Sequence, residues 1–405
     1  MVATARGLGV FSDIVGSDHV RDASPVDAVR GVSPSAVVSP GDEAEVAAVL
    51  AAATAHQLAV VPRGGGTKLD WGRPPARCDI VLSTSRIEGI VEHEPADLVC
   101  VVRAGTTLAA LQERLSSTQG FRQRLMLDPP HGDGATLGGV VATAASGSLR
   151  TRFGTPRDLV IGAGFVLSDG TIGRSGGKVV KNVAGFDVAK LLVGSLGTLA
   201  VITEIAFRLH PLPPVSRTVV LESRSVDELC AFAHAVGRLQ VTPSVVDLHW
   251  PEGVVIVRFD SSEEGAGVQA NRVAHEAGGR VLTAQEALAT TTELAGSAWR
   301  GSGAVGALAV LPSRIGALLT SMSGGICDAL VLHPLLGTGD VRFAPDAADA
   351  VRGAVRSAGG RLAIRRGDAD AVDEGDAVAL DLMRSVKRRL DPTGTLSPGR
   401  QIGGI

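Results

Sequence analysis

Two glycine-rich clusters constrain the fold of this 405-residue chain more than any other feature of its sequence. The first is RGGGT at positions 63–67, which follows a short apolar run, and the second lies at 132–139, ahead of the small-residue segment 140–147. Residues without a Cβ let the main chain approach phosphate oxygens, so that several backbone N–H groups converge on one anion. Either cluster alone is also compatible with an ordinary glycine-rich turn, but two in one domain favour a site for a diphosphate.

The sequence up to the proline-rich stretch 211–214 predicts an irregular alternation of strands and helices. Apolar runs bounded by turn residues indicate strands, and alanine-rich or amphipathic stretches indicate helices. Strands are predicted at 36–38, 58–61, 80–82, 87–93, 98–102, 160–167 and 199–207, and helices at 40–56 and 107–115. Asp169-Gly170 predicts a tight hairpin turn, because this pair readily adopts positive φ angles.

Beyond the prolines, one order of elements occurs twice. Strand, helix, strand, strand, helix and strand follow one another, the arrangement of a split βαβ unit. We therefore predict an α+β protein with an N-terminal arm over residues 1–29 and a first domain over 30–213. A second domain of two βαββαβ halves is predicted over 214–375, and a C-terminal helix and tail over 376–405 that returns to the first domain.

Composition excludes several classes of protein. The chain contains no tyrosine, so a catalytic tyrosine is excluded. Its four cysteines, at 78, 100, 230 and 327, lack the paired spacing of zinc ribbons, iron–sulfur ligands and redox dithiols, and a reduced, cytoplasmic protein is expected. The nine histidines show no metal-ligand spacing, so no metal site is expected.

Charge and hydropathy narrow the choice further. The formal net charge is −3, with Lys and Arg spread along the chain, so no nucleic-acid partner is expected. The longest apolar stretch, 46–55, falls short of the roughly 18 residues of a membrane span, so no transmembrane segment is expected.

One glycine-rich motif matches the dinucleotide-binding pattern in its residues but not in its predicted structural context. Gly301 to Gly306 fits G-x-G-x-x-G, but a predicted helix precedes it and a predicted strand follows it, the reverse of the dinucleotide fingerprint. The neighbouring Arg300 is a candidate to pair with a substrate carboxylate, and a surface salt bridge is the alternative.

Four longer motifs carry a family resemblance. They are VPRGGGTKLDWG at 61–72, DPPHGDGATLGGVVA at 128–142, GGKVVKNVAGFDVAKLLVGSLGTLAVITE at 176–204 and LDPTGTLSPGR at 390–400. Through them the chain resembles flavoproteins of the vanillyl-alcohol oxidase / p-cresol methylhydroxylase (PCMH) superfamily, and most closely the smaller FAD-binding subunits of bacterial glycolate oxidases. The resemblance is strongest over about residues 36–213.

The resemblance implies a two-subdomain, PCMH-type FAD-binding domain followed by a ferredoxin-like cap domain. Many relatives attach the flavin covalently through a histidine of the first loop; Thr67 stands in its place, so non-covalent FAD is expected. The residues implied to contact FAD are Arg63, Gly64, Gly65, Gly66 and Thr67 in the first cluster, Pro130, Ala135, Thr136, Gly138, Gly139, Ser146 and Gly147 around the second, and Gly197 and Ile202 beyond them.

The resemblance also implies an activity. A chain of this kind oxidises glycolate, a small 2-hydroxy acid, to glyoxylate together with a larger FAD-linked subunit and an iron–sulfur subunit. Its expected location is the cytoplasm, and binding to its partners would place it at the inner face of the membrane. Two alternatives stay open: a stand-alone FAD-dependent dehydrogenase of another alcohol or hydroxy acid, and a non-catalytic subunit that holds FAD for assembly.

The catalytic residues are the weakest part of the resemblance. Relatives that oxidise D-2-hydroxy acids carry a G-x-G-x-x-H segment, and here Arg342 stands at the place of its histidine. His333 lies upstream without an evident second partner, and Phe186 replaces a usual tyrosine. The sequence therefore offers no obvious base for the hydroxyl proton, and Arg300 and Arg342 are the candidates to bind the substrate carboxylate.

Overall fold

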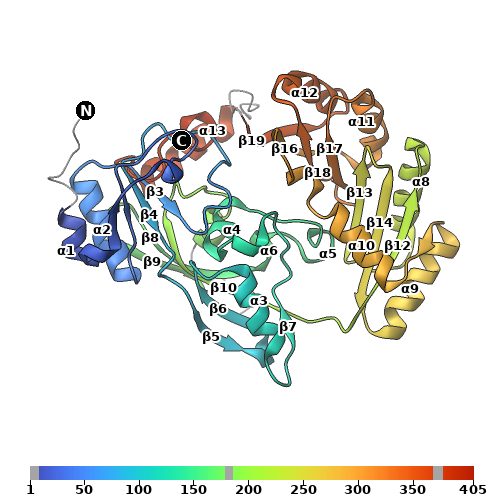
Figure 1. Ribbon diagram of the computed structural model, residues 1–405, viewed down its shortest axis with the longest axis horizontal. Helices are drawn as coiled ribbons and strands as arrows, with labels where there is room; N and C mark the ends of the chain where they lie inside the picture. Colours follow the sequence, from blue (N-terminus) through green and yellow to red (C-terminus); the bar gives the residue numbers. More distant parts are fainter. Residues whose placement is uncertain (1–8, 178–185, 368–376) are drawn as a thin grey trace. The chain divides into compact units, whose positions relative to one another are not determined.

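The computed structural model describes residues 9–177, 186–367 and 377–405 (Figure 1). The chain forms two compact units. The first comprises the residues up to Ala145, Thr155–Leu212 and the C-terminal segment to Ile405. The second comprises Ser146–Gly154 and the residues that follow from Pro213 to the C-terminal segment.

The first unit is built on two sheets. A four-stranded sheet has the order β1-β2-β4-β3, with β2, β3 and β4 parallel, and a five-stranded antiparallel sheet has the order β5-β6-β10-β8-β9. Its strands are β1 (Val20–Asp22), β2 (Ala36–Val38), β3 (Val60–Arg63), β4 (Ile80–Ser83), β5 (Ile90–Glu94), β6 (Val99–Arg103), β8 (Val160–Val166), β9 (Ile172–Gly176) and β10 (Val201–Arg208), with a small ladder of β7 (Gln123–Arg124) and β11 (His210–Pro211). Its helices are α1 (Gly9–Val15), α2 (Glu43–Ala55), α3 (Leu108–Ser117), α4 (Leu137–Thr143), α6 (Pro156–Leu159), α7 (Val188–Leu192) and α13 (Ala377–Leu390).

Local signals explain these elements. Strands β2 and β4 are buried along their whole length and read as continuous apolar runs, as expected for parallel strands covered on both faces. Helix α2 begins where the Asp42 side chain accepts a hydrogen bond from Glu45 N, at 2.8 Å. Gly170, at φ +88°, forms the turn between β8 and β9.

The described part of the expected N-terminal arm, residues 9–29, packs into the first unit. Helix α1 lies against α2, and its Phe11 side chain is fully buried. Phe11 and Val15 of this helix are therefore part of the apolar core of the unit.

The C-terminal segment completes the same unit. The bonds Val60 N to Thr395 O (2.8 Å) and Ser397 N to Val60 O (2.9 Å) add residues 395–397 alongside β3. Lys387 donates to Thr198 O and Leu396 O, each at 2.7 Å, and pairs with the buried Asp391. Residues far apart in sequence thus hold β3, and the loop that follows it, in place.

The second unit is one eight-stranded antiparallel sheet with the order β15-β12-β14-β13-β17-β18-β16-β19. The two βαββαβ runs form adjacent halves of this sheet, joined where β13 pairs with β17. Its strands are β12 (Val215–Glu222), β13 (Val245–Trp250), β14 (Val254–Ser261), β15 (Arg280–Val281), β16 (Ala304–Ala309), β17 (Ala329–His333), β18 (Thr338–Phe343) and β19 (Arg361–Arg366). Its helices are α5 (Arg150–Phe153), α8 (Val226–Arg238), α9 (Glu263–Glu276), α10 (Ala284–Leu294), α11 (Ile315–Met322) and α12 (Ala348–Ser357).

The strands of this sheet have two different faces. Val246, Leu248, Leu330 and Leu332 belong to the apolar core beneath the helices, whereas the polar side chains of these strands, Asp247, His249 and His333, occupy alternate positions. The segment Ser146–Gly154, predicted within the first domain, belongs to this unit because α5 packs on β13 and Arg152 donates to Thr242 O at 2.7 Å.

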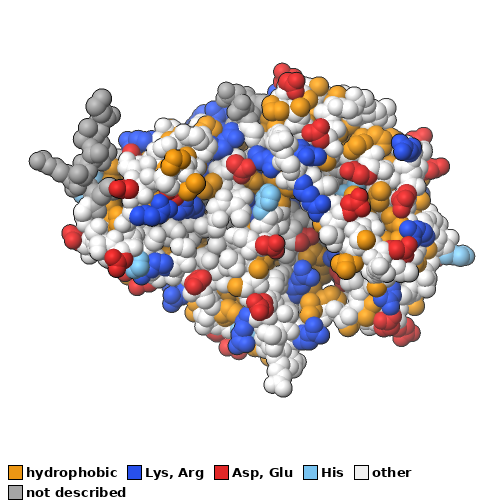
Figure 2. Space-filling model, in the orientation of Figure 1, with side chains coloured by type: hydrophobic (Ala, Val, Ile, Leu, Met, Phe, Trp, Pro, Cys, Tyr) orange, Lys and Arg blue, Asp and Glu red, His pale blue; other side chains and the backbone are white. Residues whose placement is uncertain are grey.

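Charged side chains are dispersed over the surface. On the face shown in Figure 2, Lys and Arg alternate with Asp and Glu, and no extended basic area is visible. Within the described ranges, no helix has the length and apolarity needed to span a membrane.

Candidate cofactor site

The two glycine clusters lie against each other in the first unit. The loop after β3 approaches the loop before α4 so closely that a Cβ on Gly64 would lie 1.9 Å from Thr136 Oγ1. A Cβ on Gly65 would lie 1.9 Å from the carbonyl oxygen of Gly134. Only glycine fits at either position, and the close approach places two sets of backbone N–H groups side by side.

Backbone hydrogen bonds fix the second loop to the five-stranded sheet. Leu137 N donates to Thr106 O at 2.9 Å, and Gly138 N donates to Ala104 O at 2.8 Å. The Thr136 hydroxyl accepts from Gly139 N and caps α4. The small residues at 138 and 139 therefore let α4 begin directly against the end of β6.

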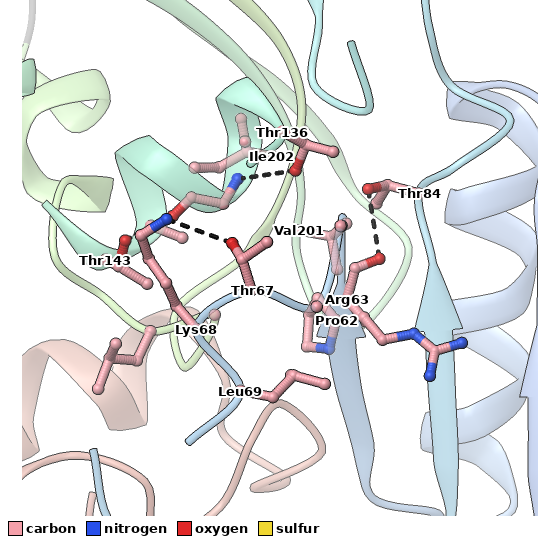
Figure 3. A pocket seen from close by; sticks show the side chains of 18 of the residues that line it. Pro62, Arg63, Thr67, Lys68, Leu69, Thr84, Thr136, Thr143, Val201 and Ile202 are labelled. Carbon is pink, nitrogen blue, oxygen red and sulfur yellow. Dashed lines mark hydrogen bonds between the residues drawn. The ribbon is translucent and has the colours of Figure 1, made fainter. Parts of the chain in front are cut away.

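A cavity opens where these loops meet (Figure 3). The empty space between its lining atoms, including open solvent at the mouth, is about 720 Å³. Residues of β3, the loop after it, α4 and the start of β10 line it. The lining is Pro62, Arg63, Gly64, Gly65, Gly66, Thr67, Lys68, Leu69, Thr84, Thr136, Gly138, Gly139, Ala142, Thr143, Leu196, Gly197, Ala200, Val201, Ile202 and Arg400.

Most of the sequence-predicted contact residues meet in this cavity. Those that line it are Arg63, Gly64, Gly65, Gly66, Thr67, Thr136, Gly138, Gly139, Gly197 and Ile202. Pro130 and Ala135 are not part of the lining, and Ala135 is buried in the core next to it. Ser146 and Gly147 belong to the second unit.

The lining suits a dinucleotide. The glycine loop and the Thr67 hydroxyl offer hydrogen-bond donors for a diphosphate, and Ala142, Leu196 and Val201 offer an apolar wall for a flat ring. The cradle is free of Cβ atoms at the two positions where the loops touch. These observations fit the cofactor implied by the resemblance, namely FAD.

Three cations line the cavity, and two of them have other partners. Arg63 pairs with Asp27 at 2.7 Å, and the hydrogen bonds from Arg21 and Arg63 hold the pKa of the Asp27 carboxyl well below its usual range. Arg400 donates to the carbonyl oxygens of Leu69 and Trp71, and burial lowers its pKa to about 10. The third cation is Lys68.

Sequence reasoning missed several lining residues, among them Lys68, Thr84, Leu196 and Arg400. Lys68 and Arg400 both lie inside motifs that carry the resemblance, VPRGGGTKLDWG and LDPTGTLSPGR. Their positions within these motifs are the feature of the sequence that could have identified them as lining residues.

The two arginines proposed as carboxylate clamps bind backbone in the second unit. Arg300 donates to Thr292 O at 2.6 Å and to Glu293 O at 2.7 Å, the carbonyl groups at the end of α10. Arg342 donates to Arg300 O at 2.6 Å. Both guanidinium groups therefore stabilise the connection between α10 and β16, in place of the salt bridge considered from the sequence.

His333 has partners that the sequence did not reveal. Its Nδ1 lies 2.7 Å from Asp247 Oδ1, and both side chains are buried. His249 lies near them, with its Nδ1 buried and without a hydrogen bond. Burial raises the pKa of Asp247, but His333, His249 and a hydrogen bond from Ser148 together outweigh this effect, and the pKa lies below its usual value. Burial lowers the pKa of His249. The described residues contain no group of three or more His, Cys, Asp or Glu side chains arranged to hold a metal ion.

Comparison with known proteins identifies a large part of the first unit as an FAD-binding domain. Residues 34–176 match a family model described as an FAD binding domain. A D-lactate dehydrogenase of Archaeoglobus fulgidus is 39% identical over 191 residues, which are 47% of this chain and 42% of the relative. Glycolate oxidase subunit GlcE of Escherichia coli is 38% identical over 165 residues, 40% of this chain and 46% of the relative. Subunit GlcD of Bacillus subtilis is 30% identical over 214 residues, 53% of this chain and 45% of the relative.

Solved structures extend the likeness to the whole fold. A p-cresol methylhydroxylase with bound substrate has a TM-score of 0.72 at 17% identity, covering 98% of this chain and 96% of that one. An alkyldihydroxyacetonephosphate synthase has a TM-score of 0.75 at 14% identity, covering 98% and 86%.

These findings define an FAD-binding flavoprotein fold of mixed α and β structure, as the sequence predicted. Residues 34–176 carry an FAD-binding domain, which confirms the cofactor FAD and the resemblance of this segment to FAD-linked oxidoreductases, and the chain shares the fold of a p-cresol methylhydroxylase. The matched segments span less than half the length of each of the three curated relatives.

Proposed function

We propose that this chain is an FAD-dependent oxidoreductase that acts on the CH–OH group of a small 2-hydroxy acid. The observation that carries the proposal is the cavity formed by the two glycine clusters, in a domain similar to those of glycolate oxidase subunits and D-lactate dehydrogenases. Bound FAD supplies the two-electron acceptor for such an oxidation, and the protein supplies position and electrostatics.

In this proposal the two loops share the work of holding the cofactor. The N–H groups of the first loop and the Thr67 hydroxyl bind the diphosphate, and the small residues at the start of α4 let the cofactor approach the backbone. No residue of the first loop offers an imidazole for covalent attachment, which supports non-covalent binding.

The finer proposal concerns substrate and partners. We propose glycolate as substrate and glyoxylate as product, in a cytoplasmic complex with a larger FAD-linked subunit and an iron–sulfur subunit. Similarity to both GlcD and GlcE supports a chain that works beside a second flavoprotein. The absence of paired cysteine spacing in the sequence supports a separate electron-accepting subunit.

Anaerobic reduction of the purified chain tests the proposed activity. Addition of glycolate or D-lactate is expected to bleach the flavin absorbance, either in the chain alone or only after the two proposed partner subunits are added. Bleaching of the isolated chain identifies a stand-alone dehydrogenase, and bleaching that requires the partners identifies the complex. A yellow protein that no 2-hydroxy acid bleaches under either condition contradicts the proposed substrate class.

A further inference from the structure

Lys68 is a buried cation on the wall of the FAD cavity. It directly follows the first glycine loop, and the residue is only 7% exposed. Its Nζ lies 3.3 Å from Thr67 Oγ1 and 5.9 Å from the centre of the Trp71 ring. In Figure 3 the ammonium group reaches towards the cavity between Thr67 and Thr143.

This ammonium group has no carboxylate partner in the described part of the chain. Burial lowers the pKa of Lys68 to about 8, and the charge of the exposed Asp70 opposes this shift from a distance. A buried ammonium that is bonded only to a hydroxyl and lies over an aromatic ring is costly unless an anion neutralises it. The side chain therefore has the properties expected of a group that binds a negatively charged ligand.

The other two cations of the lining are already engaged. The charge of Arg63 is balanced by Asp27, and the guanidinium of Arg400 is bound to two carbonyl oxygens. Among the described residues that line the cavity, Lys68 is thus the cation that bonds neither a carboxylate nor a carbonyl oxygen.

We propose, on the basis of FAD occupying this cavity, that Lys68 pairs with a negatively charged group of the bound cofactor. Two such groups exist in FAD: the diphosphate, and the isoalloxazine ring after it has taken up two electrons and one proton. The shared chemistry is an ammonium facing an anionic group, and neither case depends on the identity of the substrate. Lys68 is then a cofactor-binding residue in the first case and a residue that sets the reduction potential in the second.

Lys68→Met tests the proposal, with Lys68→Arg as the matched control that keeps the charge. Methionine retains an unbranched apolar stem over Trp71 and removes the ammonium group. Binding of FAD and of ADP to the flavin-free proteins is measured by calorimetry, and the midpoint potential of the reconstituted proteins by anaerobic dye titration. Thermal unfolding of the flavin-free proteins shows whether the substitution disturbs the fold.

The two sources of negative charge give different results. If Lys68 binds the diphosphate, Lys68→Met weakens FAD and ADP binding equally, by roughly 10- to 100-fold, the range of one hydrogen bond to a charged group. If it faces the reduced ring, ADP binding stays unchanged and the midpoint potential falls. In both cases the flavin-free Met variant unfolds at the same or a higher temperature than wild type, because an unneutralised buried charge is gone.

Two outcomes overturn the proposal. A Met variant with wild-type FAD affinity, ADP affinity and midpoint potential shows that Lys68 faces no anion. A Met variant whose flavin-free form is strongly destabilised, while its remaining folded fraction binds FAD normally, shows a structural role. Wild-type protein that binds neither FAD nor ADP would instead contradict the cofactor site itself.

Discussion

The contact between Gly65 and Gly134 gives the sharpest test of the cofactor site. Replacing Gly65 with Ala adds one methyl group whose ideal position is 1.9 Å from the carbonyl oxygen of Gly134. The φ angle of Gly65 is not in the left-handed region, so alanine brings no backbone strain of its own. The effect of this substitution is therefore purely a matter of space between the two loops.

The size of the effect follows from that distance. The two backbones must separate by about 1 Å before a methyl group fits, and crowding of this kind costs about 1–3 kcal/mol. In the proposed complex with FAD, the separation would also move the N–H groups of the first loop away from the diphosphate. Loss of two such bonds, at about 1.5 kcal/mol each, raises the Kd for FAD by about 100-fold.

The assay is titration of flavin-free Gly65→Ala protein with FAD, followed by quenching of flavin fluorescence. Gly132→Ala is the matched control, because no heavy atom lies within 4 Å of its added Cβ in the same pair of loops. We expect the control to bind FAD like wild type. Gly65→Ala protein that folds and binds FAD with wild-type affinity would refute the idea that close contact of the two loops creates the site.

Three further substitutions probe the interactions around the site. Asp27→Asn is expected to lower the unfolding temperature by a few degrees at neutral pH and to flatten the dependence of that temperature on acid pH. The folded-state pKa of Asp27 is depressed, so the ionised carboxylate stabilises the fold above about pH 4, and this stabilisation is lost as the pH falls below that value. Thermal melts at several pH values check both expectations. Arg300→Gln costs about 1 kcal/mol in urea unfolding and leaves KM unchanged, whereas a rise in KM would restore the carboxylate-clamp hypothesis. Asp391→Asn leaves the buried Lys387 ammonium unpaired and destabilises the first unit by about 3 kcal/mol in the same measurement, and an unchanged unfolding curve would contradict the proposed anchoring of the C-terminal segment.

The sequence predicted the elements of the fold well because their signals are local. The capping Asp42, the Asp169-Gly170 turn and the apolar runs of β2 and β4 each act within a few residues of chain. The two repeats of the second unit were recognisable for the same reason.

Contacts between distant segments were not predictable in this way. Asp247 and His333 occupy facing positions only because β13 pairs with β17 in the register that places Leu248 opposite Leu332. That register depends on how two separate halves of a sheet join, which no local pattern encodes. His333 therefore had no visible partner in the sequence.

The hydrogen-bond partners of Arg300 were also not predictable from the sequence, although they lie close to it along the chain. Arg300 lies only a few residues beyond α10, and its partners are the carbonyl groups at the end of that helix. The choice between a substrate clamp, a salt bridge and a helix cap depends on the path of the intervening turn. The sequence therefore identified Arg300 as a candidate but did not reveal which groups its guanidinium binds.

The central claim is that the cavity at the meeting of the two glycine clusters holds FAD without a covalent bond. The most direct measurement is to reconstitute the purified chain with FAD, remove free flavin, denature the protein and separate it from small molecules. The account predicts one FAD per chain, released into the protein-free fraction. A chain that retains no flavin after reconstitution, or flavin that stays attached to the denatured protein, would contradict it.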